Sequence, residues 1–343
     1  MTDQQSELDR PADQLRKQVP RAPGAATDSR QSGTSTAAVA AGLEFVFSMR
    51  QHAAWSLGSS AGESASWVTA YVLARLGEVP SHNLSYPQRQ KIEESLDWLL
   101  AARTSRGGWT FGATGSPDDV DSTAWAVTAL RHYGRPVPDA ALELIRRGRR
   151  ADGSFAAHPA AANKDDVSRS GAADVTAIAV RALAWIDSAA SEFLAGHLHT
   201  DIERPQGRLA SAFFVSSTLI DWEPGMAPWF VVDAVRQLVI RQEGEGAWEQ
   251  ALRLRCQMRL RMQSAWALAA SLRRSQRPDG SWPGSARLAR LAGGAEERPA
   301  SQPVGACFDH QGILATATAV SALAIGDLQP GLYFGSDLPV HRL

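Results

Sequence analysis

A helical motif recurs along the chain at a nearly constant interval, and this spacing limits the folds open to it. Four segments begin with Thr-Ala, end with Leu and carry small or apolar residues between: 69–76, 123–130, 176–183 and 316–323. Segment 231–238 is a more diverged copy. The five copies start 54, 53, 55 and 85 residues apart. An interval near 54 residues fits a repeated unit of two helices and a loop.

Each repeated segment is expected to pair with a more polar helix that precedes it, as in 88–103, 139–150 and 262–274. Turns with a glycine and an aromatic residue join the two, as at Trp109, Phe155 and Trp282. Ala-rich segments let helix backbones approach closely, whereas amphipathic helices suit an outer ring. We therefore predict an all-α fold, a single α/α toroid of about six helix pairs over residues 37–328. Segment 246–259 would be an irregular unit. The parallel inner ring would include the helices that start at Thr69, Thr123, Thr176 and Val231.

The two ends of the chain are predicted to lie outside the toroid. Residues 1–36 contain few large apolar side chains, so they cannot bury enough surface to offset their ordering entropy. We expect a disordered N-terminal tail there, with helical periodicity from about Thr36. Residues 329–343 are assigned to a C-terminal tail.

Charge and cysteine content narrow the classes of function. Lys and Arg number 35 against 36 Asp and Glu, so nothing favours a nucleic-acid or anionic membrane partner. Cys256 and Cys307 make neither a disulfide framework nor a zinc cluster, and we expect reduced core thiols. No apolar run approaches the ~20 residues of a membrane span, and no signal peptide is evident. A cytoplasmic protein is expected.

An acid-rich segment immediately precedes the repeat copy 123–130. It reads Asp118-Asp119-Val120-Asp121 and follows the turn that contains Trp109. Aspartate is favoured at a helix N-cap, where its side chain accepts free backbone N–H groups. Three carboxyl groups exceed the need of one cap. Either the cap is over-supplied with acids, or one carboxyl serves in chemistry.

These motifs resemble those of the squalene–hopene cyclases and related class II terpene cyclases. The run from Gln276 to Trp282 resembles their QW repeat. The run from Asp119 to Ala124 is similar to their Asp-x-Asp-Asp-Thr-Ala motif, with Ser122 in place of the fourth acid. In that family the central Asp protonates a double bond or an epoxide. The resemblance covers about residues 38–326, and the same repeats occur in the β subunits of protein prenyltransferases.

The resemblance implies that Asp121 is the general acid that starts cyclisation of a linear isoprenoid, a prenyl diphosphate or a prenylated small molecule. A neutral carboxyl is needed for this step, and burial beside the carboxylates of Asp119 and Asp118 would raise the pKa of Asp121. Protonation needs no cofactor, and Mg²⁺ would be involved only with a diphosphate substrate. Because one barrel replaces the family's two, the substrate would be smaller, the pocket rearranged, or a partner chain or second copy present.

A carbocation needs a dry cavity with aromatic walls. Trp125 lies four residues after Asp121, on the same helix face. Trp109 and Trp282 are expected to join helices instead. Asp309 and His310 would form hydrogen bonds at the pocket rim or cap a helix. The predicted substrate-binding residues are Trp67, Trp125, Trp229, Phe230, Phe308, Asp309 and His310.

Other functions remain open at this point. Cys307, Asp309 and His310 are too close in sequence for one tetrahedral zinc ion, so no metal site is predicted. Asp165 and Asp166 could hold Mg²⁺, but the Asp-Asp-x-x-Asp motif of class I synthases is not present. A prenyltransferase-like subunit is disfavoured by the missing zinc triad. The main alternative is a non-catalytic toroid that binds a prenyl chain or a protein partner.

Overall fold

The computed structural model describes residues 28–57, 65–111, 117–158, 172–203, 209–220, 228–243, 246–284, 309 and 311–327. Within these residues it has no β-strand, only isolated bridges that pair Gln51 with Ala54 and Arg149 with Phe155. One short 3₁₀ turn spans Ser81–Asn83. The helices are α1 (Asp28–Ser48), α2 (Ala65–Leu76), α3 (Tyr86–Ala101), α4 (Val120–His132), α5 (Asp139–Arg147), α6 (Ala173–Leu183), α7 (Ser188–Glu203), α8 (Leu209–Ile220), α9 (Trp229–Arg241), α10 (Ala247–Arg259), α11 (Ala265–Arg274) and α12 (Ile313–Asp327).

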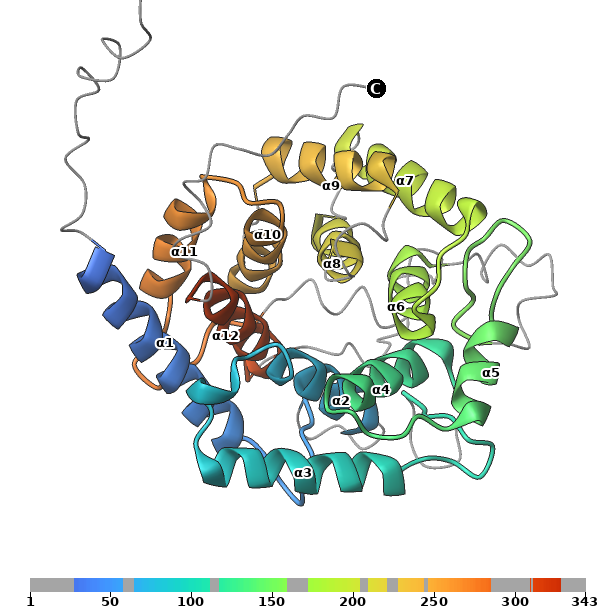
Figure 1. Cartoon of the computed structure of the whole chain (residues 1–343), viewed down its shortest axis with the longest axis horizontal. Helices are drawn as coiled ribbons and strands as arrows, with labels where there is room; N and C mark the ends of the chain where they lie inside the picture. Colours follow the sequence, from blue (N-terminus) through green and yellow to red (C-terminus); the bar gives the residue numbers. More distant parts are fainter. Residues whose placement is uncertain are drawn as a thin grey trace, which may run out of the picture.

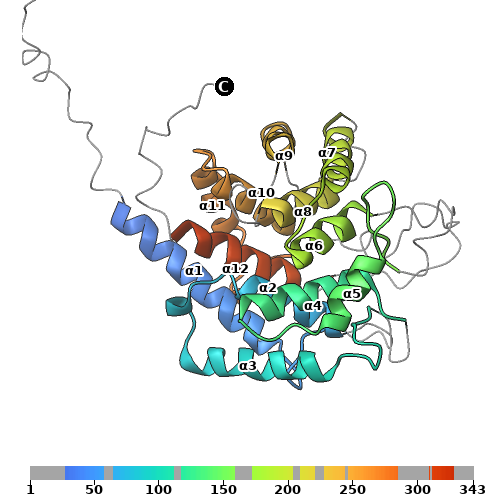
Figure 2. The ribbon, with the colours of Figure 1, turned by 45° about the vertical axis from the view of Figure 1, so that its right-hand side comes forward.

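These helices form two concentric rings (Figure 1). The even-numbered helices pack in order from α2 to α12, and α12 closes the ring against α2. The odd-numbered helices surround them, and Figure 2 shows the same arrangement turned by 45°. The predicted single α/α toroid of six helix pairs is therefore confirmed.

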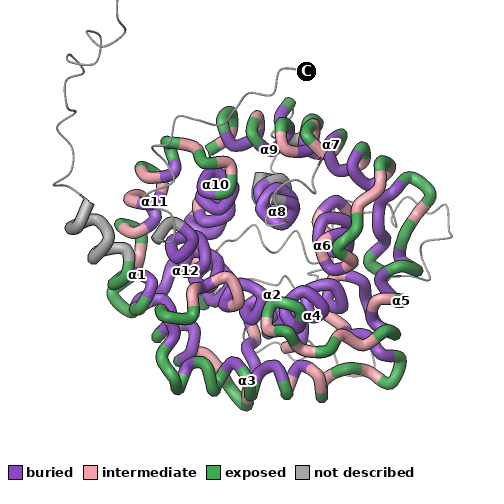
Figure 3. Tube along the Cα trace, viewed as in Figure 1, coloured by how far each residue is buried: buried purple, intermediate pink, exposed green. Residues whose placement is uncertain are grey.

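Burial separates the two rings (Figure 3). In inner helix α2, 11 of its 12 residues are buried, whereas outer helix α3 buries five of 16. A helix that is apolar on all sides must be enclosed, and a helix with one apolar stripe lies at the surface. The Ala-rich composition of the repeated segments thus places them inside.

Four repeat copies have a threonine at the same position, and the structure gives the reason. In four units a threonine Oγ1 at the inner-helix start accepts the backbone N–H of the aromatic residue in the preceding turn. The tryptophans among these aromatics also donate their indole N–H to a carbonyl at the end of the outer helix. Trp109 and Trp282 therefore join helices, as predicted. The threonine pairs are Trp55–Thr69 (2.9 Å), Trp109–Thr123 (3.1 Å), Phe155–Thr176 (2.9 Å) and Trp282–Thr316 (2.9 Å), and the indole acceptors are Val46, Leu99 and Leu272 (2.7 Å each).

The assignment of 231–238 to the inner ring was wrong. Helix α9, which contains it, belongs to the outer ring and packs on α7, α8 and α10. Trp229 at its start is 80% exposed, and its buried residues form a single stripe: Val231, Ala234, Val235, Leu238 and Val239. The inner helix here is α8, which lacks the Thr-Ala signature. Segment 246–259, predicted to be irregular, lies in the regular inner helix α10.

The predicted N-terminal boundary also needs correction. Helix α1 begins at Asp28, so residues 28–36, assigned to the tail, are helical. The buried residues Val39, Leu43 and Val46 anchor this helix. Adding turns to an anchored helix costs little, because nucleation has already occurred. Residues 1–27 and 328–343 lie outside the described residues. In the part that is described, no helix is long and apolar enough to cross a membrane.

Candidate active site

Helix α2 defines three levels along the barrel axis through residues spaced four apart. Trp67, Tyr71 and Arg75 lie one turn above another on one helix face. Trp67 contacts Asp121 of α4 through a hydrogen bond, so both helices start at the same end. Below we call Trp67, Asp121 and Asp174 the acid level. Tyr71, Trp125, Phe214 and Trp248 form the aromatic level, and Arg75, Glu78, Arg181 and Arg255 form the arginine level.

Asp119 caps α4. Its Oδ1 accepts the backbone N–H of Ser122 at 2.7 Å, and its Oδ2 accepts the Ser122 hydroxyl at 2.9 Å and the Phe111 backbone N–H at 2.6 Å. Burial raises the pKa of this carboxyl, against the opposing effect of these donors. Ser122 thus serves the cap. Asp121, in the first turn, is not needed for capping.

Asp121 has the character expected of an acid. It is half-buried, so part of it is accessible, and its Oδ2 accepts the indole N–H of Trp67 at 2.7 Å. Burial raises its pKa well above the ordinary value, and the carboxyls of Asp174 and Asp119 raise it further. The indoles of Trp67 and Trp125 act in the opposite direction. A carboxyl in this setting can stay protonated at neutral pH and transfer its proton to an apolar acceptor.

Asp174 occupies in α6 the position that Asp121 occupies in α4, two residues before the repeated threonine. The N-cap of α6 is Ala172, so Asp174 lies in the first turn and is not the N-cap. Its Oδ1 accepts the backbone N–H of Val175 at 2.9 Å. Burial raises its pKa, which the nearby His197 opposes. The site therefore brings together carboxyls from two neighbouring repeats.

The aromatic level lies one turn deeper. The Tyr71 ring is 5.6 Å from that of Trp67 and 4.8 Å from that of Trp125. Phe214 of α8 lies 5.6 Å from Trp125 and 5.8 Å from Trp248, measured between ring centroids. Trp67 and Trp125, predicted from the sequence, are thus in the site. Tyr71 lies in the repeat copy 69–76 but was not among the predicted substrate-binding residues. Phe214 and Trp248 lie on helices without the repeat signature, so the sequence offered no signal for them.

The arginine level closes the other end of the inner ring. Glu78 accepts Arg255 Nη1 at 2.7 Å, Arg181 Nη2 at 3.1 Å and Arg75 Nη1 at 3.4 Å. Ser321 of α12 donates to the same carboxylate at 2.7 Å. Burial works to raise the pKa of Glu78, but the three guanidinium groups outweigh it and hold that pKa well below the usual range. These contacts join the C-terminal halves of α2, α6, α10 and α12, so those helices run parallel.

Two further acids predicted from the sequence, Asp118 and Asp309, are buried just before inner helices. Asp118 is buried against Gly108 in the turn before α4, and neither of its carboxyl oxygens has a hydrogen-bond partner within the described part of the chain. Asp309 accepts the backbone N–H of Ala315 at 2.9 Å and so caps α12, one of its two predicted roles. Burial raises its pKa to about 6.

Two of the remaining predicted residues do not join the site. Trp229 and Phe230 begin outer helix α9, where their rings contact each other at 6.0 Å and Trp229 is exposed. Their expected position near an inner-helix start was wrong, because the apolar stripe of α9 is that of a surface helix. Phe308 and His310 lie outside the described residues, as do Cys307, Asp165 and Asp166. Over the described ranges, no three His, Cys, Asp or Glu side chains gather in a possible metal site.

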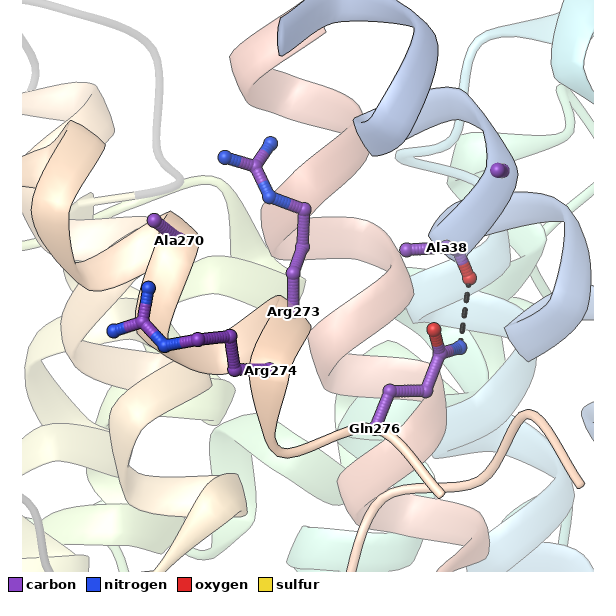
Figure 4. Close-up of a pocket in the computed structure, with 6 residues that line it drawn as sticks. Ala38, Ala270, Arg273, Arg274 and Gln276 are labelled. Atoms are coloured by element: carbon purple, nitrogen blue, oxygen red, sulfur yellow. Dashed lines mark hydrogen bonds between the residues drawn. The ribbon is translucent and has the colours of Figure 1, made fainter. Parts of the chain in front are cut away.

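Two surface cavities lie away from Asp121. One of about 480 Å³ lies between α1 and α11, with Arg273 and Arg274 on one side and Ala38 on the other (Figure 4). There the Gln276 side-chain amide donates to the Ala38 carbonyl at 2.9 Å. The other, of about 550 Å³, lies where α2 leads into α3 and is lined by Glu78 and Tyr133 among others. Neither contains a residue of the acid level.

The fold has counterparts among solved structures, although no family model and no curated protein matches the sequence. A protein from Actinoplanes is 22% identical, with a TM-score of 0.63 over 85% of this chain and 99% of its own. The type II terpene cyclase MstE from Scytonema in complex with merosterolic acid A, its product, is 18% identical, with a TM-score of 0.66. MstE in complex with geranylgeranyl dihydroxybenzoate, its substrate, is 17% identical, with a TM-score of 0.65.

These likenesses establish a terpene-cyclase-like fold. Both MstE structures align over 87% of this chain and 99% of their own length. The single toroid found here is therefore matched by nearly the whole of each solved MstE chain.

Proposed function

We propose that this protein is a class II terpene cyclase in which Asp121 protonates a linear isoprenoid. One observation carries the proposal. Asp121 is a half-buried residue whose carboxyl has a raised pKa and is not used as a cap, and it lies one turn above buried aromatic rings. The fold shared with MstE supports it, and the three acids in 118–121 are consistent with it.

The chemistry follows from the states of the carboxyl. The protonated form transfers its proton to one carbon of a terminal alkene, whose π electrons form the new C–H bond. The neighbouring carbon becomes cationic and is attacked by the next double bond, which closes a ring. Proton loss from the final cation forms an alkene, so the product is an isomer of the substrate. The Trp67 N–H stabilises the carboxylate left on Asp121, and the rings of Trp67 and Phe111, 5.8 Å apart, offer π faces to the cation.

The substrate class follows from the surroundings of the acid. The site supplies aromatic faces for an uncharged isoprenoid chain, and its acids disfavour an anionic group beside Asp121. A head group would therefore lie away from the acid. A prenylated aromatic compound, the class named for MstE, and a prenyl diphosphate both satisfy this arrangement. Mg²⁺ would be involved only with the diphosphate.

The test is cyclisation in D₂O. Purified protein is incubated with geranyl, farnesyl and geranylgeranyl diphosphates and with the corresponding prenylated dihydroxybenzoates, and products are analysed by mass spectrometry and NMR. We expect an isomer of one substrate that carries a single deuterium on the carbon protonated by Asp121. An isoprenoid that binds the protein but is recovered without a new ring or deuterium would indicate the alternative, a non-catalytic prenyl-binding toroid.

A further inference from the structure

Exposure falls from the acid level to the aromatic level beneath it. Asp121 is half-buried and Trp67 is 8% exposed. One turn deeper, Tyr71, Trp125 and Trp248 have no exposed surface and Phe214 is 3% exposed. Four residues of an α-helix rise about 6 Å, so a prenyl chain that rests against Trp125 has only its end beside Asp121.

Phe214 is central to this closure. Its ring centroid lies within 5.6 to 6.2 Å of those of Trp125, Trp248 and Tyr71, so it contacts all three other rings of the aromatic level. Phe214 comes from α8, which packs between α6 and α10 in the inner ring. Its side chain has no polar atom, and its removal therefore leaves no hydrogen bond unpaired.

The other rings are fixed in place. The Tyr71 hydroxyl lies 2.6 Å from Thr318 Oγ1 and accepts the Trp248 indole N–H at 3.3 Å. Beneath them, the Arg75 guanidinium lies 5.0 Å from the Tyr71 ring and 5.3 Å from the Trp125 ring. Arg75 is in turn part of the arginine level. The aromatic level therefore cannot move deeper without breaking buried polar contacts.

On the basis of the proposed function, we infer that Phe214 and Trp125 act as a stop that determines which double bond of the isoprenoid Asp121 protonates. The chain enters from the acid side with its terminal unit first and rests against these rings. The terminal alkene then lies beside Asp121. Internal alkenes remain on the other side of the acid and react only as nucleophiles.

Shortening Phe214 should move the chain deeper. In Phe214→Ala the terminal unit can enter the vacated space, which places the next alkene beside Asp121. The deuterium from D₂O should then appear on an internal carbon, and the terminal dimethylallyl group should survive in the product. We expect the internally labelled product to rise at least about tenfold relative to the parent, the discrimination typical of small size changes in an apolar pocket. Phe214→Leu should give a smaller change in the same direction.

Phe213→Ala is the matched control. Phe213 is the neighbouring residue on α8, equally buried, and makes none of the ring contacts of the aromatic level. Its truncation creates a cavity of the same size in the same helix. The position of the deuterium should remain that of the parent.

A binding measurement keeps this inference separate from the proposed acid chemistry. In an Asp121→Asn background, which cannot transfer the proton, Phe214→Ala should bind farnesol at least about tenfold more tightly, because additional CH₂ groups become buried. Phe213→Ala should not. This binding measurement tests the stop at Phe214 even if the protein proves not to be a cyclase. A folded Phe214→Ala variant with unchanged deuterium position, or with unchanged farnesol affinity, would overturn the inference.

Discussion

The indole N–H of Trp67 and the carboxyl of Asp121 form a 2.7 Å hydrogen bond that joins the neighbouring inner helices α2 and α4. The bond has two effects. It orients the carboxyl, and it favours the ionised form, so it lowers the pKa that burial raises. A donor of this kind also stabilises the carboxylate formed once the proton has been transferred. Trp67 thus makes Asp121 a stronger acid than burial alone would allow and stabilises its conjugate base.

Parallel inner helices explain why charges are separated along the barrel. The N-terminal ends carry partial positive charge and the C-terminal ends partial negative charge. Asp121 and Asp174 lie at the former, Arg181 and Arg255 towards the latter. The helix termini therefore stabilise both sets of ions. For Asp121 this acts against protonation, and burial together with the second carboxyl is needed to overcome it.

Replacing Asp121 with Asn should separate chemistry from capping. Turnover should fall by about two orders of magnitude or more, since the transferable proton is lost. The free energy of unfolding should not decrease, because Asp119 caps α4 and burial of the Asp121 carboxyl disfavours its charged form. Steady-state kinetics and urea denaturation measure the two effects. Asp97→Asn, at an exposed position on α3, is the control and should change neither. Parent-like turnover by Asp121→Asn would exclude this residue as the acid.

Trp67→Phe should shift the pH dependence of turnover upward. The substitution keeps an aromatic ring against Tyr71 but removes the donor to Asp121. Without that donor the pKa of Asp121 rises, so the protonated form persists to higher pH. The falling limb of the profile of kcat against pH should move to higher pH. Trp55→Phe removes an indole donor to a backbone carbonyl elsewhere and should leave the limb in place.

Asp174→Asn should have the opposite effect. Loss of a like charge lowers the pKa of Asp121, so less of the acid is protonated at neutral pH. The falling limb should move to lower pH, while kcat at the acidic plateau stays within about twofold of the parent, because Asp121 itself is unchanged. Asp152→Asn, at an exposed turn, provides the comparison. A uniform loss of kcat at every pH would show that Asp174 positions the site and does not tune the acid.

The sequence predicted the fold where a short-range pattern coincided with burial. Four inner helices are marked by a threonine that accepts a hydrogen bond from the preceding turn: Thr69, Thr123, Thr176 and Thr316. Because this hydrogen bond recurs in each of these units, the threonine recurs in the sequence at the same position of the repeat. Helix α8 lacks the Thr-Ala signature, so its inner position could not be found from the repeat. The diverged repeat copy 231–238 led to the amphipathic α9 being predicted as the inner helix instead.

Part of the acid level and Trp125 of the aromatic level were predictable, whereas the arginine level was not. Asp121 and Trp125 lie one turn apart in a single helix, which the spacing of four residues indicates. Asp174 and Phe214 come from other helices, and Glu78 binds three arginines from α2, α6 and α10. Contacts of this kind depend on ring closure, which brings residues more than a hundred positions apart together. One sequence gives no means of pairing them.

Glu78→Gln should reveal how strongly the arginine level holds the ring together. The side chain of Glu78 is only 2% exposed, and its removal leaves Arg75, Arg181 and Arg255 as mutually repelling buried cations. Loss of one partner from a buried ion pair costs about 3 to 5 kcal/mol, so the free energy of unfolding should fall by about that amount.

The pH dependence of this loss identifies its cause. The folded-state pKa of Glu78 is depressed, so its stabilisation is present above the unfolded pKa and disappears as pH falls through the folded value. The difference between parent and Glu78→Gln should therefore be full at neutral pH and shrink in strong acid, as measured by urea denaturation. Glu94→Gln, which disrupts a half-exposed pair with Arg50, should cost less than about 1 kcal/mol. If Glu78→Gln proved no more destabilising than Glu94→Gln, the arginine level would contribute no more to stability than a surface ion pair.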